Sequence, residues 1–264
     1  MRLDNYLVEK GYFITRNKAQ QAIKNNRIKV NNLIINKSGY DINEKDIIEI
    51  EKVEYEFVSR GGYKLLKAIK EFNLDFNNKI VIDIGASTGG FSDCSIQFGA
   101  KKVYAIDVGS NQLDDTLKNN PKIISIENTN ARDLNTDDYK DIDYIVMDLS
   151  FISITKLLDV LNNLLFNNNI NLIVLIKPQF EVENKFINKN GLVKNKEIHY
   201  EVINKIINSF KSHEIYLQKL TYSPIRGEKS GNIEYLAMFN KNYNIDIDKI
   251  NIKEIINNAY INFL

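Results

Sequence analysis

A run of glycines and small residues between an apolar segment and a helical pattern is the first place in this sequence where chemistry could take place. Residues 80–91 read Ile-Val-Ile-Asp-Ile-Gly-Ala-Ser-Thr-Gly-Gly-Phe, which is typical of a strand, a tight turn and the start of a helix. Glycine lets a backbone approach a bulky ligand closely, and the first N–H groups of a helix are free to bind a carboxylate or a phosphate. We therefore expect a nucleotide-cofactor loop here.

Two acids and the spacing of the glycines favour S-adenosylmethionine over a nicotinamide dinucleotide as the cofactor. The loop lacks the G-x-G-x-x-G spacing that fits a pyrophosphate, and Asp83, at the end of the apolar run, would repel phosphate but attract an amino or sulfonium group. Asp107 ends the next apolar run, 102–106, where an acid can accept hydrogen bonds from ribose hydroxyls. A plain strand-to-helix turn is the alternative, but it requires neither three glycines nor two acids.

Lys177 and Asp148 each follow an apolar run and form a candidate catalytic pair. Methyl transfer to an alcohol requires the oxygen to lie in line with the methyl group and to lose its proton. Lys177 follows the run 170–176, and its ammonium could stabilise the developing alkoxide, since partial burial can lower the pKa of a lysine. Asp148 follows the run 144–147 and could hold that lysine near the cofactor. An ion pair that only closes the sheet is the alternative interpretation.

The elements that must position these residues alternate between apolar runs and helical patterns. This alternation predicts a doubly wound parallel α/β sheet, in which ligands bind at the carboxyl ends of the strands. The last two strands are close enough in sequence to pair as an antiparallel hairpin, and Lys64 lies in the first turn of a helix that precedes the sheet. The expected strands are 80–84, 102–106, 122–126, 144–147, 170–176, 214–221 and 233–239, and further helices are expected near 111–119, 154–166 and 196–211.

Charge is unevenly distributed over the first 57 residues. Residues 1–37 carry eight Lys/Arg and two acids, a net of +6, whereas residues 38–57 carry two Lys and seven acids, a net of −5. Thr15 is expected to cap a helix whose apolar stripe is Ala19, Ala22 and Ile23, so that lysine and arginine occupy the opposite face. One basic face on a small module indicates nucleic-acid binding, with a solvated surface as the alternative.

The composition of the whole chain excludes several other classes of protein. The chain has 264 residues and a formal net charge of +1, so total charge indicates no partner. A single cysteine, Cys94, excludes an internal disulfide framework, and no Cys/His cluster has metal-ligand spacing. The sequence shows neither a signal segment nor an apolar run of 18 residues, so a cytoplasmic protein with no membrane or metal partner is expected.

Four blocks of the amino-terminal module resemble the S4 RNA-binding domain and lie in that family's order: Arg2-Leu-Asp4, Arg16-Asn-Lys-Ala-Gln20, Arg27-Ile-Lys-Val-Asn31 and Asp46-Ile-Ile-Glu-Ile50. The sequence departs from the family at Asn32, where Gly is usual, and this affects the hairpin more than the cationic face. The resemblance implies that the module binds RNA helices through their phosphates and shape. The expected RNA contacts are Arg2, Arg16, Lys18, Lys24, Arg27, Lys29 and Arg60.

The rest of the chain resembles the TlyA family, which joins an S4 domain to an FtsJ-like domain and whose members are often named haemolysins. The strings that carry this resemblance are residues 59–65, 83–91, 148–153, 176–181 and 231–236. Together with the S4 blocks they span about residues 1–240, with Gly62 and Tyr63 as departures. The resemblance implies a Rossmann-like class I methyltransferase fold, S-adenosylmethionine as methyl donor, and ribose 2′-hydroxyls of ribosomal RNA, cytidine in particular, as acceptors within ribosomal subunits.

Within that resemblance, four residues occur in the order of the Lys-Asp-Lys-Glu tetrad of FtsJ-like RNA 2′-O-methyltransferases: Lys64, Asp148, Lys177 and Glu234. Lys177 would activate the 2′-hydroxyl and Asp148 would orient Lys177 and the methyl group. Lys64 would steer the RNA and assist Lys177, and Glu234 would position Lys64 or the ribose. Which lysine lies nearer the oxygen is left open.

The expected cofactor contacts surround the glycine-rich loop and the following strand ends: Asp83, Gly85, Ala86, Ser87, Thr88, Gly89, Gly90, Phe91, Asp107, Val108, Ala131, Arg132, Asp148 and Leu149. The expected domains are an S4-like module at 1–57, a methyltransferase domain at 58–242, and a helical tail at 243–264 of unknown role.

Two other functions compete with this interpretation. A pore-forming haemolysin would need segments that can span a membrane, and the sequence has neither a long apolar run nor a secretion signal. An RNA-binding protein with an inactive methyltransferase fold would not be expected to keep both the loop 83–91 and the complete tetrad.

Overall fold

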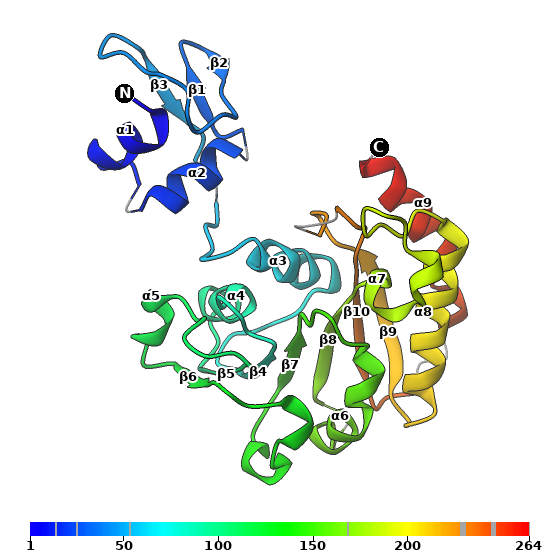
Figure 1. Cartoon of the computed structure of the whole chain (residues 1–264). Coiled ribbons are helices and arrows are strands. Elements are labelled where there is room, and N and C mark those ends of the chain that lie inside the picture. Colours follow the sequence, from blue (N-terminus) through cyan, green and yellow to red (C-terminus); the bar gives the residue numbers. More distant parts are fainter. Residues whose placement is uncertain are drawn as a thin grey trace. The chain divides into compact units, whose positions relative to one another are not determined.

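The computed structural model describes residues 1–13, 15–24, 26–52, 54–167, 169–227, 231–243 and 247–263. The chain forms two compact units, Met1–Glu56 and Phe57–Leu264, whose elements are labelled in Figure 1. Each unit has a hydrophobic core of its own.

The first unit consists of two helices packed on a small antiparallel sheet with strand order β2-β1-β3. Its elements are α1 (Leu3–Glu9), α2 (Arg16–Lys24), β1 (Ile28–Val30), β2 (Leu33–Ile34) and β3 (Ile48–Ile50). The backbone N–H of Lys18 donates to Thr15 Oγ1 at 3.3 Å, so Thr15 caps α2 as predicted. Leu3, Leu7 and Ile23 are fully buried between the helices and the sheet.

Two asparagines form the turn between β1 and β2. Val30 pairs with Leu33 across the hairpin, and the intervening Asn31 and Asn32 have φ angles of 50° and 66°. Left-handed backbone at both central positions matches the twist of a two-residue hairpin, and asparagine tolerates this conformation better than most residues other than glycine. Asn32 therefore fits the turn at the position where the sequence departs from the S4 pattern.

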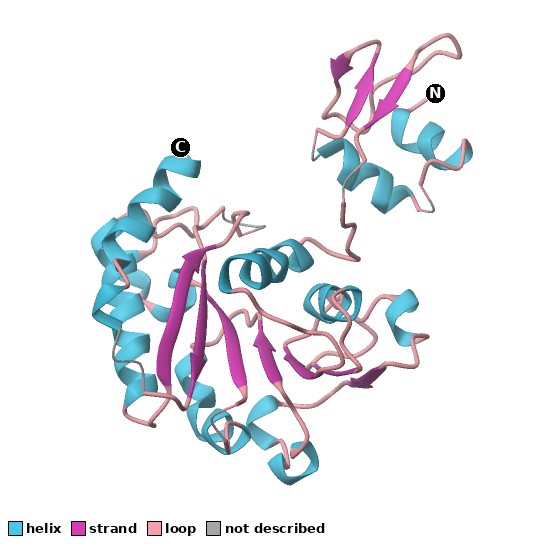
Figure 2. Cartoon of the chain, turned by 180° about the vertical axis from the view of Figure 1, so that it is seen from behind, coloured by secondary structure: helices cyan, strands magenta, loops and turns pink. Residues whose placement is uncertain are grey.

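The second unit is built on a seven-stranded sheet with the order β6-β5-β4-β7-β8-β10-β9, seen from behind in Figure 2. The strands are β4 (Ile80–Ile84), β5 (Lys102–Ile106), β6 (Ile123–Ile126), β7 (Tyr144–Met147), β8 (Asn171–Ile176), β9 (Tyr216–Tyr222) and β10 (Tyr235–Asn240). The first five are mutually parallel, and β10 runs antiparallel to both β8 and β9. The predicted doubly wound sheet with an antiparallel ending is confirmed.

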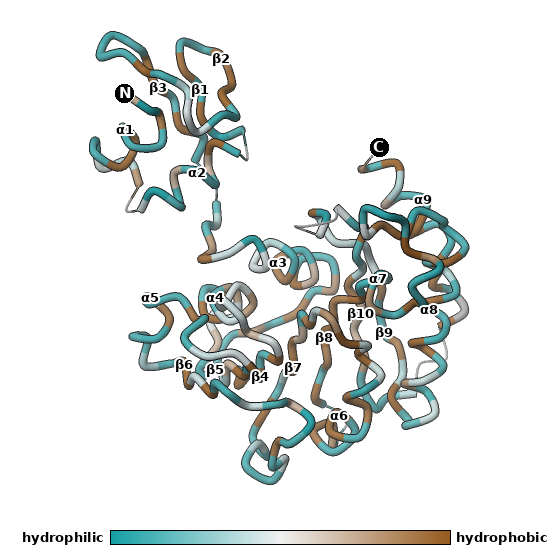
Figure 3. The backbone as a smooth tube through the Cα atoms, viewed as in Figure 1, coloured by the Kyte–Doolittle hydropathy of each residue, from teal (hydrophilic) through white to brown (hydrophobic). Residues whose placement is uncertain are grey.

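Helices pack on both faces of this sheet because its strands are apolar on both faces. Ile82 of β4 belongs to the same hydrophobic cluster as Leu161 and Ile203 on the helices of one face. Asp83, the next residue of β4, points to the other face, where Ser92 donates to it. Figure 3 shows the central strands mainly in the hydrophobic colour.

The helices of the second unit agree with the predicted pattern except at two places. They are α3 (Gly61–Phe72), α4 (Gly90–Gln97), α5 (Asp115–Lys118), α6 (Leu158–Leu164), α7 (Pro178–Glu181), α8 (Lys196–Lys211) and α9 (Ile252–Phe263). The helix expected near 111–119 is only the short α5, because the side chain of Asp114 accepts the N–H of Thr116 and fixes the start there. The helix expected near 154–166 begins as a 3₁₀ turn, Ile154–Leu157, before α6.

The carboxy-terminal helix α9 packs into the core of the second unit through Ile256 and Ala259. Tyr260 Oη donates to the carbonyl of Lys194 at 2.9 Å and lies 3.3 Å from Nε2 of the buried His199. No role could be predicted for this tail from the sequence. In the structure, α9 is part of the packing around α8 and β9.

Candidate active site

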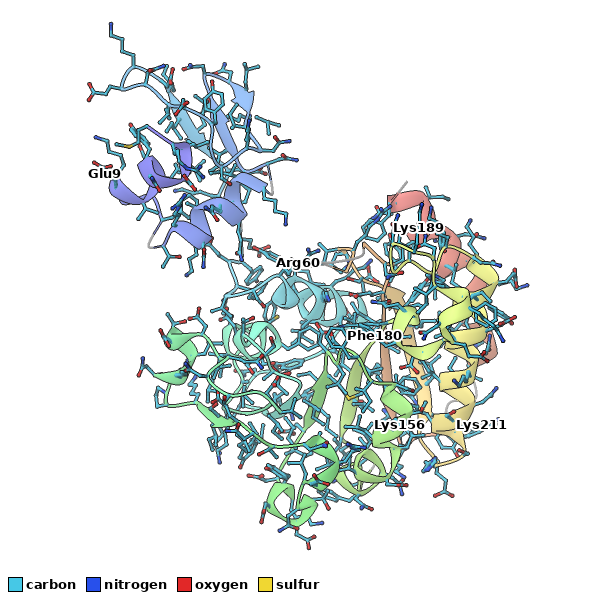
Figure 4. All side chains as sticks on the ribbon, in the orientation of Figure 1. Glu9, Arg60, Lys156, Phe180, Lys189 and Lys211 are labelled. Atoms are coloured by element: carbon cyan, nitrogen blue, oxygen red, sulfur yellow. The ribbon has the colours of Figure 1, made fainter. Side chains whose placement is uncertain are left out.

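A cavity of about 600 Å³ lies at the carboxyl ends of the parallel strands of the second unit. Asp148 follows β7 and Lys177 follows β8, so both side chains emerge at this edge of the sheet. Lys64 enters from the first turn of α3. Figure 4 labels Arg60, at the start of α3, and Phe180, on α7, which also line the cavity.

The antiparallel direction of β10 brings Glu234 to the same edge. Tyr235, the first residue of β10, pairs with Ile176, the last residue of β8. Glu234 directly precedes Tyr235, and Lys177 directly follows Ile176. Glu234 and Lys177 therefore lie at the same level on adjacent strands of the sheet. A parallel strand would have placed Glu234 at the opposite edge, away from the cavity.

The four predicted catalytic residues are in direct contact. Lys64 Nζ lies 2.8 Å from Glu234 Oε2 and 3.3 Å from Asp148 Oδ2. Lys177 Nζ lies 2.7 Å from Asp148 Oδ1 and donates to Ser150 Oγ at 2.7 Å. Asp148 is thus shared by both lysines. Lys64 contacts two carboxylates, whereas Lys177 contacts one carboxylate and a neutral hydroxyl.

Burial makes these four charges depend on one another. The side chains of Lys64 and Lys177 are 8% and 9% exposed, and that of Glu234 is 3% exposed. Burial disfavours the charge on Asp148, but Lys64 and Lys177 outweigh it, and the pKa of Asp148 is lowered. Burial likewise disfavours the charge on Lys64, but Asp148 and Glu234 outweigh it and its pKa is raised. Asp148 and Lys64 are therefore held in their ionised forms.

A third buried carboxylate, Asp83, lines the same cavity without a cationic partner. It is 1% exposed, and its Oδ2 accepts from Ser92 Oγ at 2.7 Å. Oδ1 is buried and has no hydrogen-bond partner among the described residues. Burial raises the pKa of Asp83 to about 7, with the negative charge of Asp148 adding to the shift. A cationic amino group in the cavity would satisfy this oxygen, so the residues fit the amino-acid end of S-adenosylmethionine.

The glycine-rich loop has the backbone geometry that only small residues allow. Gly85 has φ +80°, and a Cβ there would lie 2.7 Å from Leu149 Cδ2 and 3.2 Å from the carbonyl oxygen of Asp148. Ser87, with φ 50°, donates its N–H to Asp107 Oδ2 at 2.8 Å. Gly85 therefore allows the ends of β4 and β7 to approach closely, and Asp107 fixes the loop between β4 and α4.

The cavity brings together a majority of the predicted cofactor contacts. Those that line it are Asp83, Gly85, Ala86, Ser87, Thr88, Gly90, Phe91 and Asp148. Those outside its lining are Gly89, Asp107, Val108, Ala131, Arg132 and Leu149. A Cβ at Gly89 would lie 2.3 Å from Leu117 Cδ1, so packing against α5 already requires this glycine. Arg132 Nε donates to Asn130 Oδ1 at 3.3 Å.

Several residues that line the cavity were not predicted from the sequence as site residues. Ser59, Ser150, Phe151 and Phe180 are among them, and the rings of Phe151 and Phe180 lie 5.1 Å apart between centroids. All four lie inside the strings that resemble the TlyA family, so their position beside Lys64, Asp148 and Lys177 was the available signal.

Most of the cations expected to bind RNA in the first unit are engaged within that unit. Arg2 and Arg16 form ion pairs with the fully buried Asp4 at 3.0 and 2.9 Å, although their own side chains are 47% and 53% exposed. Arg27, only 13% exposed, contacts Glu56 at 3.3 Å, and Lys29 lies 3.9 Å from Glu49. Within the described residues, the side chains of Lys18 and Lys24 contact no acid.

Among the helices of the described residues, none has both the length and the apolar character to cross a membrane. No group of three or more His, Cys, Asp or Glu in this part of the chain could hold a metal ion.

Two family models match the chain. The model described as an FtsJ-like methyltransferase matches residues 57–241, and the S4 domain model matches residues 1–48. The resemblances to both families are confirmed.

Curated relatives cover most of the chain. Hemolysin A of Brachyspira hyodysenteriae is 43% identical over 90% of this chain and 99% of the relative. A protein of Bacillus subtilis provisionally named rRNA methyltransferase YqxC is 41% identical over 89% of this chain and 84% of the relative. The 23S rRNA (cytidine-2′-O)-methyltransferase TlyA of Campylobacter jejuni is 33% identical over 92% of this chain and 100% of the relative.

A solved structure from Streptococcus thermophilus, of a protein provisionally named a hemolysin, is similar with a TM-score of 0.77. Its sequence is 34% identical, and the match covers 100% of this chain and 96% of that chain. Family models, relatives and fold agree. The chain belongs to the FtsJ-like methyltransferase family, among the TlyA-related and Hemolysin A-related members that join an S4 domain to the methyltransferase domain.

Proposed function

We propose that this protein transfers a methyl group from S-adenosylmethionine to the ribose 2′-hydroxyl of a cytidine in ribosomal RNA. One observation carries the proposal. Four residues contact one another in a single cavity, and the unpaired carboxylate oxygen of Asp83 lies in the same cavity: they are Lys64, Asp148, Lys177 and Glu234. The names of the relatives from Campylobacter jejuni and Bacillus subtilis support ribosomal RNA as the acceptor, and the former supports cytidine.

The residues divide the work between cofactor and acceptor. When bound, S-adenosylmethionine supplies a methyl group activated by the positive charge of its sulfur. Asp83 would pair with the amino group of the cofactor, and the loop from Gly85 to Gly90 would hold its amino-acid end. As the 2′-oxygen takes the methyl group and gives its proton to water, Lys177 would stabilise the negative charge that develops on the oxygen, because its ammonium is shared with only one carboxylate.

The other members of the tetrad hold Lys177 in place. Asp148 contacts Lys177 at 2.7 Å and keeps its ammonium at the cavity edge. Lys64 neutralises the second oxygen of Asp148, and Glu234 in turn balances Lys64. This arrangement keeps two positive and two negative groups paired before the substrate enters, so little reorganisation is needed during the reaction.

The first unit docks the RNA. A basic S4 unit binds through phosphates, and among the cations expected to contact RNA, Lys18 and Lys24 have no acidic partner in the described residues. Two acidic residues of 38–56 pair with other cations of the unit, Glu56 with Arg27 and Glu49 with Lys29.

The test is transfer of labelled methyl from S-adenosylmethionine to purified, unmethylated ribosomal subunits, followed by mapping of ribose methylation in the RNA. Label at a cytidine 2′-oxygen is expected with the wild-type chain. The matched control is Lys211→Met, which removes an exposed lysine at the end of α8 that does not line the cavity. Label found on a base or on ribosomal protein, with none on ribose, would contradict the proposal.

A further inference from the structure

Two connecting segments, called loops here, follow β7 and β8, and the second contains the short helix α7. The loops carry the catalytic pair at their beginnings and are in contact again further along the chain. Asp148 begins the first loop and Lys177 the second, and the two side chains touch. Five residues after Asp148, the hydroxyl of Ser153 donates to Glu181, which lies four residues after Lys177. The two loops are therefore joined at both ends.

Glu181 makes the second junction with both of its carboxylate oxygens. Oε2 accepts from Ser153 Oγ at 2.5 Å, and Oε1 accepts from the backbone N–H of Ile154 at 2.8 Å. Glu181 is only 7% exposed. Burial raises its pKa, and the hydrogen bonds from Ser153 and Ile154 oppose that shift. The structure thus keeps a carboxylate where an apolar side chain would be easier to bury.

The position of these donors explains what the carboxylate does. Ser153 is the N-cap of the 3₁₀ turn Ile154–Leu157, which leads into α6. The first N–H groups of a helix lack partners inside the helix and favour a negative charge. Glu181, the last residue of α7, supplies both the hydrogen-bond acceptor and the negative charge. The start of the 3₁₀ turn is therefore fixed relative to the segment that carries Lys177.

A strained residue lies between the two junctions. Phe151 has φ 68°, a left-handed backbone that is unusual for a bulky side chain. Such a conformation persists only where the surroundings impose it. The first loop is held at Asp148 by the lysines and at Ser153 and Ile154 by Glu181, and these attachments leave the intervening residues little freedom.

We infer that Glu181 is a positioning residue, which sets the placement of Lys177 against Asp148 by locking the two loops that carry them. The carboxylate of Glu181 binds Ser153 and Ile154 rather than Lys177 or Asp148, and its effect passes through the segments that carry those two residues. The inference rests on the proposed function, because placement of the pair is read out as methyl transfer.

Two substitutions separate this role from a general loss of stability. Glu181→Ala removes both acceptors, and its turnover is expected to fall by about 10- to 100-fold, as small displacements of catalytic groups typically cause. Glu181→Gln keeps an oxygen for Ile154 and places an amide donor at Ser153, whose hydroxyl can turn toward Thr155 Oγ1 at 2.7 Å. Gln is therefore expected to restore most of the turnover.

The measurements are kcat, KM for ribosomal RNA, the Kd for S-adenosylmethionine and the Tm of the full chain. Positioning predicts a fall in kcat for Glu181→Ala with KM and Kd within about twofold of wild type at a temperature far below its Tm. The matched control is Glu183→Gln, which removes an exposed carboxylate of the same segment and is expected to leave all four values unchanged.

The outcomes are distinguishable. If folded Glu181→Ala has the wild-type kcat, or if its activity falls only in proportion to unfolded protein, the positioning role is overturned while the proposed function stands. If the wild-type chain transfers no methyl group to RNA, the proposed function fails. Loss of kcat in Glu181→Ala with recovery in Glu181→Gln supports the inference.

Discussion

Each unit of the molecule contains a carboxylate held between two cations, and the two arrangements serve different ends. In the first unit, Asp4 accepts from Arg2 Nε and Nη2, both at 3.0 Å, and from Arg16 Nε at 2.9 Å. In the second, Asp148 lies between Lys64 and Lys177 at 3.3 and 2.7 Å. Arginine pairs with the carboxylate that holds the fold of the first unit together, and lysine pairs with the carboxylate that lines the cavity of the second.

The surroundings of the two carboxylates show why. Asp4 also accepts from Gln20 at 2.7 Å, and the hydrogen bond from Arg2 is the main cause that holds its pKa well below the ordinary value. Its arginines are about half exposed, whereas the lysines on Asp148 are at most 9% exposed. A guanidinium has a rigid fork that commits its donors to one geometry, while an ammonium can present a compact charge to a reacting atom.

Removing the cation on the Asp148 side should have the largest effect. Lys177→Met keeps much of the side-chain length but deletes the charge that we propose stabilises the developing alkoxide, so turnover is expected to fall by about 10²–10³-fold. Binding of S-adenosylmethionine, measured by calorimetry, should change far less. Lys177→Arg should not restore full turnover, because the guanidinium is larger and differently shaped. Near wild-type turnover in a folded Lys177→Met protein would move this role to Lys64.

Removing the carboxylate on the Asp4 side should affect folding and leave the chemistry intact. Asp4→Asn weakens several charge-assisted hydrogen bonds, and the first unit is expected to lose about 1–3 kcal/mol of stability. Because the folded-state pKa of Asp4 is lowered from 3.8, its contribution is present above about pH 4 and is lost as the pH falls. Hydrogen exchange of residues 3–50 in the full chain measures this effect, with Glu9→Gln, labelled in Figure 4, as the exposed control. Unchanged protection in Asp4→Asn would contradict the structural role.

Asp83 differs from both of these carboxylates, because it is buried and has no cationic partner among the described residues. Since its pKa is raised to about 7, a cationic ligand must displace a proton below that pH. The affinity for S-adenosylmethionine is therefore expected to fall by up to about tenfold per pH unit between pH 7 and 5.5. Calorimetry in buffers of different protonation enthalpy measures the released proton. Asp83→Asn should bind more weakly at pH 7.5 and lose this dependence, and an equal slope in both proteins would assign the proton to another group.

The smallest expected effect concerns cations that no acid holds. Lys18→Ala should reduce the slope of log K against log salt for ribosomal RNA binding by about 1, because one phosphate contact is lost. Arg27→Ala removes a cation that is 13% exposed and already paired with Glu56, so it should leave the slope unchanged and lower the stability of the first unit. Equal slopes for Lys18→Ala and wild type would place the RNA on another face.

What could be predicted from the sequence was local. An apolar run followed by one polar residue marks a strand end, so Asp107, Asp148 and Lys177 were predicted to lie at one edge of the sheet, and they do. The engagement of Arg16 was not predicted, because its partner Asp4 is 12 residues away. Glu181 and Ser153 are 28 residues apart, and only the adjacency of β7 and β8 brings them together.

The residues of the cavity show the same limit. The glycines of the loop were interpreted as ligand contacts, but a Cβ at Gly89 would collide with Leu117 on α5. Whether a glycine is required by a ligand or by packing depends on neighbours that the local sequence does not name. Glu234 was located through the family's order of residues, and its contact with Lys64 follows from the antiparallel direction of β10.

The buried histidine offers a spectroscopic handle on the docking of the carboxy-terminal helix. The chain has two histidines, so imidazole nitrogen resonances can be assigned with a single substitution. His199 Nε2 lies 2.9 Å from the carbonyl of Val193 and Nδ1 lies 2.7 Å from Tyr235 Oη. A carbonyl only accepts, so Nε2 carries the hydrogen. Because Tyr235 follows Glu234 and Tyr260 of α9 touches the same ring, the His199 signal would register both the docking of α9 and the integrity of the strand that begins beside Glu234.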